Sequence, residues 1–132
     1  MRLLLDTHVW LWFALDPGRV SADVQALLGS VDTEIYVSVA SLWEVVIKTS
    51  LGKLDLPDPP ETFWECQTRG SGMATLPIRP EHILDIAVLP HIHRDPFDRL
   101  LVAQARVERL TLVTTDPKIR AYPVATLSAE SS

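Results

Sequence analysis

Four acidic residues of the 132-residue chain stand where carboxylates could do chemistry together: Asp6, Glu44, Asp98 and Asp116. Two carboxylates a few ångströms apart repel each other by about 1 to 4 kcal/mol, so a cluster of them needs a counter-charge. A hard divalent cation supplies it, because Mg²⁺ and Mn²⁺ favour oxygen ligands and keep several waters. Such a site suits phosphodiester hydrolysis, in which the metal activates water and stabilises the developing charge.

The elements that must position these acids alternate along the chain. Apolar and β-branched runs alternate with helix-length amphipathic stretches, which is the pattern of strands joined by crossover helices. The pattern predicts strands over 2–5, 34–39, 73–78, 110–115 and 124–127, and helices over 7–15, 21–28, 41–49, 61–69, 80–88 and 95–108. We therefore expect the α/β class, with a central parallel sheet of about four to five strands.

The predicted topology brings the four acids to one edge of that sheet. Asp6 and Asp116 directly follow strands, and Glu44 lies in the first turns of the helix that leaves the second strand. Asp98 opens the helix that runs back to the strand at 110–115, so this helix begins at the edge where that strand ends. Chemistry in open α/β sheets occurs at this carboxyl edge.

Each acid also has a structural interpretation. Asp6 and Asp116 could cap the helices that follow them. The segment Ser41-Leu-Trp-Glu44 matches a capping box, and Glu44 could instead pair with Lys48 one turn on. None of these interpretations explains why four acids should meet at one edge.

The segment His93-Arg-Asp-Pro-Phe-Asp-Arg99 holds two acids with separable roles. Asp95 before Pro96 fits an N-cap followed by proline in the first turn, which leaves Asp98 free to face the site. Asp98 is therefore the better metal ligand, with Asp95 as the alternative. The His91-x-His93 spacing occurs in zinc sites, but no other His or Cys lies nearby, so a loop or helix-end role is favoured.

The charge balance limits the kinds of partner. The chain has 12 Lys and Arg against 17 Asp and Glu, a net charge of −5, which excludes a broad basic surface for duplex DNA. Setting aside the acids of the predicted site and Asp95 leaves 12 acids against 12 bases, so the acidity is concentrated where a bound metal would offset it.

The length and the apolar content predict a single domain over 1–132, with residues 128–132 as a frayed Ser-rich tail. The single cysteine, Cys66, excludes an internal disulfide and a cysteine zinc cluster. The longest apolar run, Val9–Leu15, is too short to span a membrane, so we expect a cytoplasmic protein without a membrane partner.

Four motifs in order resemble the PIN domain, and in particular the VapC-type toxins of bacterial type II toxin–antitoxin systems. They are Asp6-Thr-His, Ser41-Leu-Trp-Glu44, Asp95-Pro-Phe-Asp98-Arg-Leu-Leu-Val-Ala-Gln-Ala105 and Leu112-Val-Thr-Thr-Asp116. The resemblance implies a three-layer α/β/α sandwich and a Mg²⁺- or Mn²⁺-dependent endoribonuclease with Asp6, Glu44, Asp98 and Asp116 as its acidic quartet. It also implies a homodimer, a small VapB-like antitoxin partner and RNA substrates, often transfer RNA.

The mechanism that we expect places the principal metal on Asp6 and Asp98. Glu44 and Asp116 would complete a second site or orient a metal-bound water that attacks the scissile phosphate. The candidate phosphate-positioning residues are Lys48, Arg94, Arg99 and Lys118. Two alternatives are a DNA or flap-type nuclease with the same acidic site, and a non-catalytic doubly wound interaction module whose acids merely bind Mg²⁺.

Overall fold

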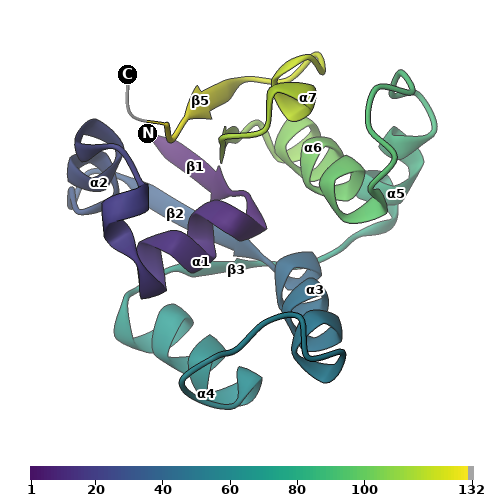
Figure 1. Cartoon of the computed structure of the whole chain (residues 1–132). Coiled ribbons are helices and arrows are strands. Elements are labelled where there is room, and N and C mark those ends of the chain that lie inside the picture. Colours follow the sequence, from purple (N-terminus) through teal and green to yellow (C-terminus); the bar gives the residue numbers. More distant parts are fainter. Residues whose placement is uncertain (131–132) are drawn as a thin grey trace.

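The central element of the fold is a five-stranded parallel sheet, seen here in a computed structural model that describes residues 1–130 (Figure 1). Its strands follow the order β3-β2-β1-β4-β5 across the sheet. They are β1 (Arg2–Leu5), β2 (Glu34–Ser38), β3 (Ala74–Leu76), β4 (Thr111–Thr114) and β5 (Thr126–Ser128). The number of strands and their parallel direction confirm the predicted sheet.

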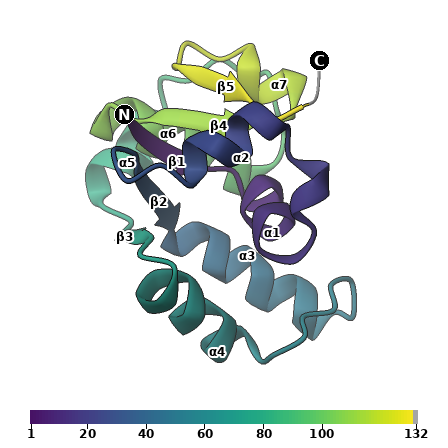
Figure 2. The same cartoon turned by 90° about the vertical axis from the view of Figure 1, so that its left-hand side faces the viewer.

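Helices cover both faces of the sheet, as Figure 2 shows for α1 and α2 on one side and α5 and α6 on the other. They are α1 (Thr7–Leu15), α2 (Ala22–Leu28), α3 (Val39–Ser50), α4 (Pro60–Glu65), α5 (Pro80–Ile86), α6 (Pro96–Glu108) and α7 (Pro117–Arg120), with a 3₁₀ turn at Pro17–Arg19 and a π turn at Cys66–Gly70. Within residues 1–130, no helix combines the length and apolarity that a membrane crossing requires.

The apolar core has two halves because successive strand residues point to opposite faces of a sheet. Leu3 and Leu5 of β1 pack with Trp10 of α1, whereas Leu4 packs on the other face with Leu101 of α6. All five side chains are fully buried. This arrangement is the three-layer α/β/α sandwich that the resemblance implies.

Several element boundaries differ from the sequence prediction. The helix expected over 61–69 ends at Glu65 and continues as the π turn, and the strand expected over 73–78 is only Ala74–Leu76. The four-residue helix α7 follows the capping position considered for Asp116, but it is too short to give the periodic pattern from which the other helices are predicted.

The alternative interpretation of Ser41 and Glu44 as a capping box is wrong. Helix α3 begins earlier, at Val39, and the Ser38 hydroxyl caps it by accepting from the Ala40 N–H at 3.0 Å. Ser41 therefore lies inside the helix, where its hydroxyl is 2.8 Å from that of Thr7 on α1.

The chain stays ordered into the segment expected to fray, residues 128–132. Ser128 belongs to β5, and Ala129 is fully buried with its N–H donating to the Thr114 carbonyl at 3.1 Å. Residues 131–132 lie outside the described part of the chain.

A buried polar contact ties α6 to β2. The Ser38 hydroxyl donates to Oε1 of Gln104 at 2.6 Å, and Nε2 of Gln104 donates to the Pro77 carbonyl at 3.2 Å. Gln104 and Ser38 are both fully buried. The contact links the helix that carries Asp98 to the strand end from which α3 leaves with Glu44.

The order of the strands marks where a site should lie. The chain runs outward from β1 to β2 and β3, then crosses back to β4 and β5 on the other side of β1. The crevice outside the carboxyl ends of β1 and β4 is thus the topological switch point, which is where open α/β sheets bind ligands.

Candidate active site

Asp6 comes directly after β1 at the switch point, and it is only 3% exposed. Its backbone takes the N-cap position of α1, but its side chain makes no capping hydrogen bond. Oδ2 instead accepts from the Thr114 hydroxyl at 2.8 Å, and Oδ1 is buried without a hydrogen-bond partner. The capping interpretation therefore does not account for this carboxylate.

Glu44 reaches the same edge from α3, and it too is only 3% exposed. Its Oε2 accepts from Nζ of Lys48 at 2.7 Å, so the expected i,i+4 pair is present. Oε1 is buried without a partner. The Ser41–Thr7 hydroxyl contact fastens this part of α3 to α1 and so fixes Glu44 relative to Asp6.

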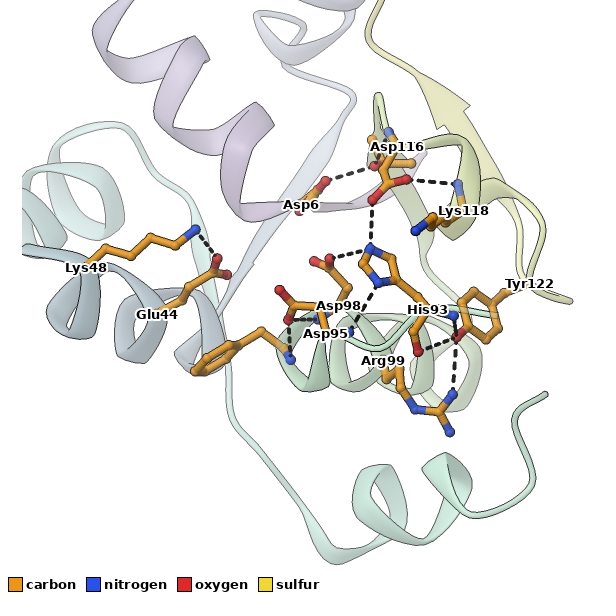
Figure 3. Close-up of polar contacts among 12 residues, drawn as sticks. Asp6, Glu44, Lys48, His93, Asp95, Asp98, Arg99, Asp116, Lys118 and Tyr122 are labelled. Atoms are coloured by element: carbon orange, nitrogen blue, oxygen red, sulfur yellow. Dashed lines mark hydrogen bonds and ion pairs between the residues drawn. The ribbon is translucent and has the colours of Figure 1, made fainter. Parts of the chain in front are cut away.

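Asp95 takes the capping role that the sequence predicts for it. Oδ1 of Asp95 accepts from the N–H groups of Phe97 and Asp98, at 2.8 and 3.2 Å, and so caps α6. The carboxylate of Asp98 makes no such cap, and its Oδ2 lies 3.0 Å from Nε2 of His93. Capping therefore leaves Asp98 free to face the other acids (Figure 3).

Asp116 both caps a helix and faces the site. Its Oδ1 accepts from the Lys118 N–H at 2.8 Å, which caps α7, and its Oδ2 lies 2.9 Å from Nε2 of His93. The side chain is 30% exposed, the most open of the four acids.

His93 is the site residue that sequence reasoning missed. Its ring lies between Asp98 and Asp116, and its backbone N–H donates to the Tyr122 hydroxyl at 2.8 Å. The His91-x-His93 spacing drew attention to this residue, but for zinc and not for contact with acids. Only the fold shows the contact with Asp116, because the two residues are 23 positions apart in the sequence.

The electrostatics of the site reflect its crowding. Burial, followed by the charges of Asp6, Asp95, Glu44 and Asp116, raises the pKa of the Asp98 carboxyl from 3.8 to about 8. Burial is also the main cause that raises the pKa of Asp6, and the Thr114 hydrogen bond opposes it. Without a cation, the protein therefore keeps a proton on the Asp98 carboxyl, which would ordinarily be ionised at neutral pH.

The donor set fits a hard divalent cation. Two fully buried carboxylate oxygens, Oδ1 of Asp6 and Oε1 of Glu44, have no hydrogen-bond partner, and buried polar atoms normally have one. Within residues 1–130, the group whose candidate ligand atoms all lie within 4.8 Å of one another is His93, Asp98 and Asp116, without Asp6 or Glu44. In Figure 3, Asp6 and Glu44 lie on one side of the site, and His93, Asp98 and Asp116 lie on the other.

The four candidate phosphate-positioning cations are not equivalent. Arg94 and Lys118 are exposed and lie within two residues of Asp95 and Asp116 in the sequence, and Lys48 is held by Glu44. Arg99 points away, because its guanidinium donates to the Pro90 and Ile86 carbonyls and to the Tyr122 hydroxyl. Since these contacts occupy it, Arg99 is better understood as an anchor for α6 than as a phosphate-binding residue.

Comparison with known proteins assigns this chain to a family. The family model of the PIN domain matches residues 3–125, so the chain belongs to the PIN-domain family. A curated relative, Ribonuclease VapC22 of Mycobacterium tuberculosis, is 28% identical over 121 residues, which is 91% of each chain. The family resemblance found in the sequence is thereby confirmed.

Solved structures share the fold at low sequence identity. VapBC2 from Rickettsia felis bound to a DNA fragment from its promoter matches with a TM-score of 0.70 and 14% identity, over 97% of this chain and 98% of that one. DNA-bound VapBC from Salmonella typhimurium also gives a TM-score of 0.70, with 12% identity over the same shares. FitAcB from Neisseria gonorrhoeae gives 0.60, with 20% identity over 95% of this chain and 96% of that one.

Proposed function

We propose that the protein is a Mg²⁺- or Mn²⁺-dependent endoribonuclease, the VapC-type toxin of a type II toxin–antitoxin system, built as a single PIN-like domain. The observation that carries the proposal is the meeting of Asp6, Glu44, Asp98 and Asp116 at the switch-point edge, with two buried carboxylate oxygens left without partners. The likeness to a relative named as a ribonuclease supports it.

Asp6 and Asp98 would hold the principal ion, with Glu44 and Asp116 at a second site or orienting the attacking water. When bound, the ion would offset the carboxylate charge, activate water and stabilise the charge that develops on the phosphate. Asp95 would act through the cap of α6, although it remains the alternative ligand.

The chain's own cations would position the RNA. Lys118 and Arg94 are exposed beside the acidic edge, where they can contact the phosphates that flank the cleaved bond. Lys48 already neutralises Glu44, and we propose that it moves to a phosphate once a metal ion takes over that charge. Since a net charge of −5 gives no broad basic footprint, binding would depend on these few contacts and on the ion.

The partners follow from the same proposal. We expect a homodimer that a small VapB-like antitoxin neutralises, acting in the cytoplasm on RNA, often transfer RNA. Structural neighbours that are themselves VapBC complexes support the antitoxin partner.

A cleavage assay on labelled RNA and on DNA of matched sequence tests the function. We expect RNA cleavage with Mg²⁺ or Mn²⁺, none with a chelator, and a loss of at least about 100-fold in Asp6→Asn and Asp98→Asn, more than loss of an outer-shell contact costs. Asp58→Asn, an acid-to-amide change on an exposed loop, is the matched control and should cleave normally.

Each other outcome selects an alternative. Equal cleavage of DNA would favour the DNA or flap-type nuclease. Metal binding without cleavage of either strand would favour the interaction module. Full activity of Asp98→Asn together with loss in Asp95→Asn would exchange the roles of the two acids. Growth arrest on expression that Asp6→Ala leaves unchanged would contradict a toxin that acts through this site.

A further inference from the structure

His93 lies in the candidate site, although no sequence motif assigned it there. We propose that His93 is a positioning residue: its Nε2–H donates to the carboxylate of Asp116, and its ring lies against the carboxylate of Asp98, so that His93 keeps both acids in place for the metal without itself binding the ion. The proposal rests on the proposed function, since it deepens the description of that metal site.

The ring occupies the gap between two acids on separate elements. Nε2 lies 3.0 Å from Oδ2 of Asp98, in the first turn of α6, and 2.9 Å from Oδ2 of Asp116, at the cap of α7. The side chain is 16% exposed, so the contact is shielded from water. Figure 3 shows the ring set between the two carboxylates.

The other ring nitrogen determines what Nε2 can do. Nδ1 accepts from the Asp95 N–H at 3.2 Å, so Nδ1 carries no hydrogen and the ring hydrogen is on Nε2. A nitrogen that carries a hydrogen has no lone pair for a metal ion. Although His93, Asp98 and Asp116 are close enough to form a mixed nitrogen and oxygen site, this tautomer makes His93 a hydrogen-bond donor to Oδ2 of Asp116 and leaves Nε2 no lone pair for a metal ion.

The backbone of His93 is fixed as firmly as its ring. Its N–H donates to the hydroxyl of Tyr122, a residue 3% exposed, at 2.8 Å. The same hydroxyl accepts from the Arg99 guanidinium at 3.2 Å, and Arg99 also donates to carbonyls after α5 and within it. Arg99 and Tyr122 thus form the support that keeps the imidazole in place.

The consequence is an ordered set of ligand oxygens. Asp116 has both oxygens engaged, one by the cap of α7 and one by His93, so its carboxylate cannot rotate freely. Asp98 has only Oδ2 in contact with His93, which leaves Oδ1 available to an ion. Partners of this kind, which orient metal ligands, typically change metal affinity by about 10–100-fold.

Two polar replacements separate the roles of the two ring nitrogens. In His93→Asn, the amide can occupy the position of Nδ1 and accept from Asp95, but it cannot reach the carboxylates. In His93→Gln, the longer amide places an N–H donor near the position of Nε2. His91→Ala, on an exposed neighbour, is the matched control.

The measurement is Mn²⁺ affinity of the full chain without RNA, by electron paramagnetic resonance, with Mg²⁺ affinity by competition. Thermal melts establish that each variant is folded. We expect His93→Asn to weaken binding of both ions by about 10–100-fold, His93→Gln to recover part of that loss, and His91→Ala to match the wild type.

Three results would overturn the proposal: unchanged affinity in His93→Asn, equal losses in the Asn and Gln variants, or a loss confined to Mn²⁺. The last would mean that His93 is a direct nitrogen ligand, because imidazole favours Mn²⁺ over Mg²⁺. Wild-type protein that binds the ions but cleaves no RNA would contradict the nuclease proposal alone. Wild-type protein that binds neither ion would overturn both.

Discussion

The two sides of the acidic edge are built in different ways. On the α6 and α7 side, Asp98 and Asp116 meet His93, and Asp116 is held further by the α7 cap. On the β1 and α3 side, Asp6 and Glu44 are each 3% exposed, and each has one oxygen with a protein partner and one with none. Protein hydrogen bonds and contacts hold the carboxylates of the first side, whereas the second side leaves two buried carboxylate oxygens without a hydrogen bond.

The difference indicates where a cation contributes most to stability. A buried polar atom without a partner costs about 1–3 kcal/mol, and more when the group is charged. Two such atoms face the site from Asp6 and Glu44, so an ion that reached them would remove a cost already present in the folded protein. On the α6 and α7 side, Asp98 and Asp116 would contribute carboxylate oxygens that His93 already holds in position.

The largest expected effect is on the pH dependence of stability without metal. The folded protein keeps protons on Asp98, whose pKa is raised to about 8, and on Asp6, whose pKa is also raised, at pH values where the unfolded chain has lost them. The unfolded chain therefore binds fewer protons. The free energy of unfolding should fall as pH rises from about 4 to about 8, by a few kcal/mol.

Urea unfolding between pH 4 and 9 in the presence of a chelator measures this slope. In Asp98→Asn the fall should be shallower, and at pH 8 the variant should be more stable than the wild type. Parallel curves for the two proteins would mean that Asp98 ionises normally, and the contrast between the two sides would then lose its electrostatic basis.

The next effect is stabilisation by metal. At about 100 times its dissociation constant, Mg²⁺ or Mn²⁺ should raise the free energy of unfolding by about 2.7 kcal/mol. Asp6→Asn removes a carboxylate from the side that lacks partners, so this increment should disappear while the metal-free variant stays folded. Unfolding curves with and without the ion provide the measurement, with Asp58→Asn as control. An increment that survived in Asp6→Asn would place the ion on the α6 and α7 side alone.

The smallest effect concerns the cap that separates Asp95 from Asp98. Asp95→Ala should lower the free energy of unfolding by about 1 kcal/mol, because two N–H groups of α6 lose their acceptor. Asp95→Asn should cost less, since asparagine caps helices nearly as well as aspartate. Thermal or urea unfolding distinguishes them, and equal losses would show that charge matters here more than the hydrogen bonds.

Sequence reasoning predicted the parts of the site that follow from the order of elements. Asp6, Glu44, Asp98 and Asp116 were placed at one edge because each is tied to a strand end or a helix start, and the PIN-domain family was identified from the same motifs. His93 and Arg99 depend instead on where a loop and a short helix lie in space. Their contacts with Asp116 and Tyr122 span 23 to 29 residues of the sequence, so no local pattern indicates them.

Capping was predictable only in part, for a physical reason. Asp95-Pro96 fixes its own helix start, because proline presets the backbone of the first turn. Ser38 and Ser41 offer the same hydroxyl three residues apart, and the length of β2 decides which one caps α3. Tertiary pairing therefore determined a choice that local sequence left open.

The buried contact between Ser38 and Gln104 gives the edge a mechanical property. Glu44 and Asp98 lie on different helices, α3 and α6. The Ser38–Gln104 contact joins the start of α3 to α6 without involving either carboxylate. The spacing between the two acids is thereby set by the scaffold and not by the repulsion between their charges. The scaffold can therefore keep the like-charged carboxylates at the same spacing whether or not a cation is bound.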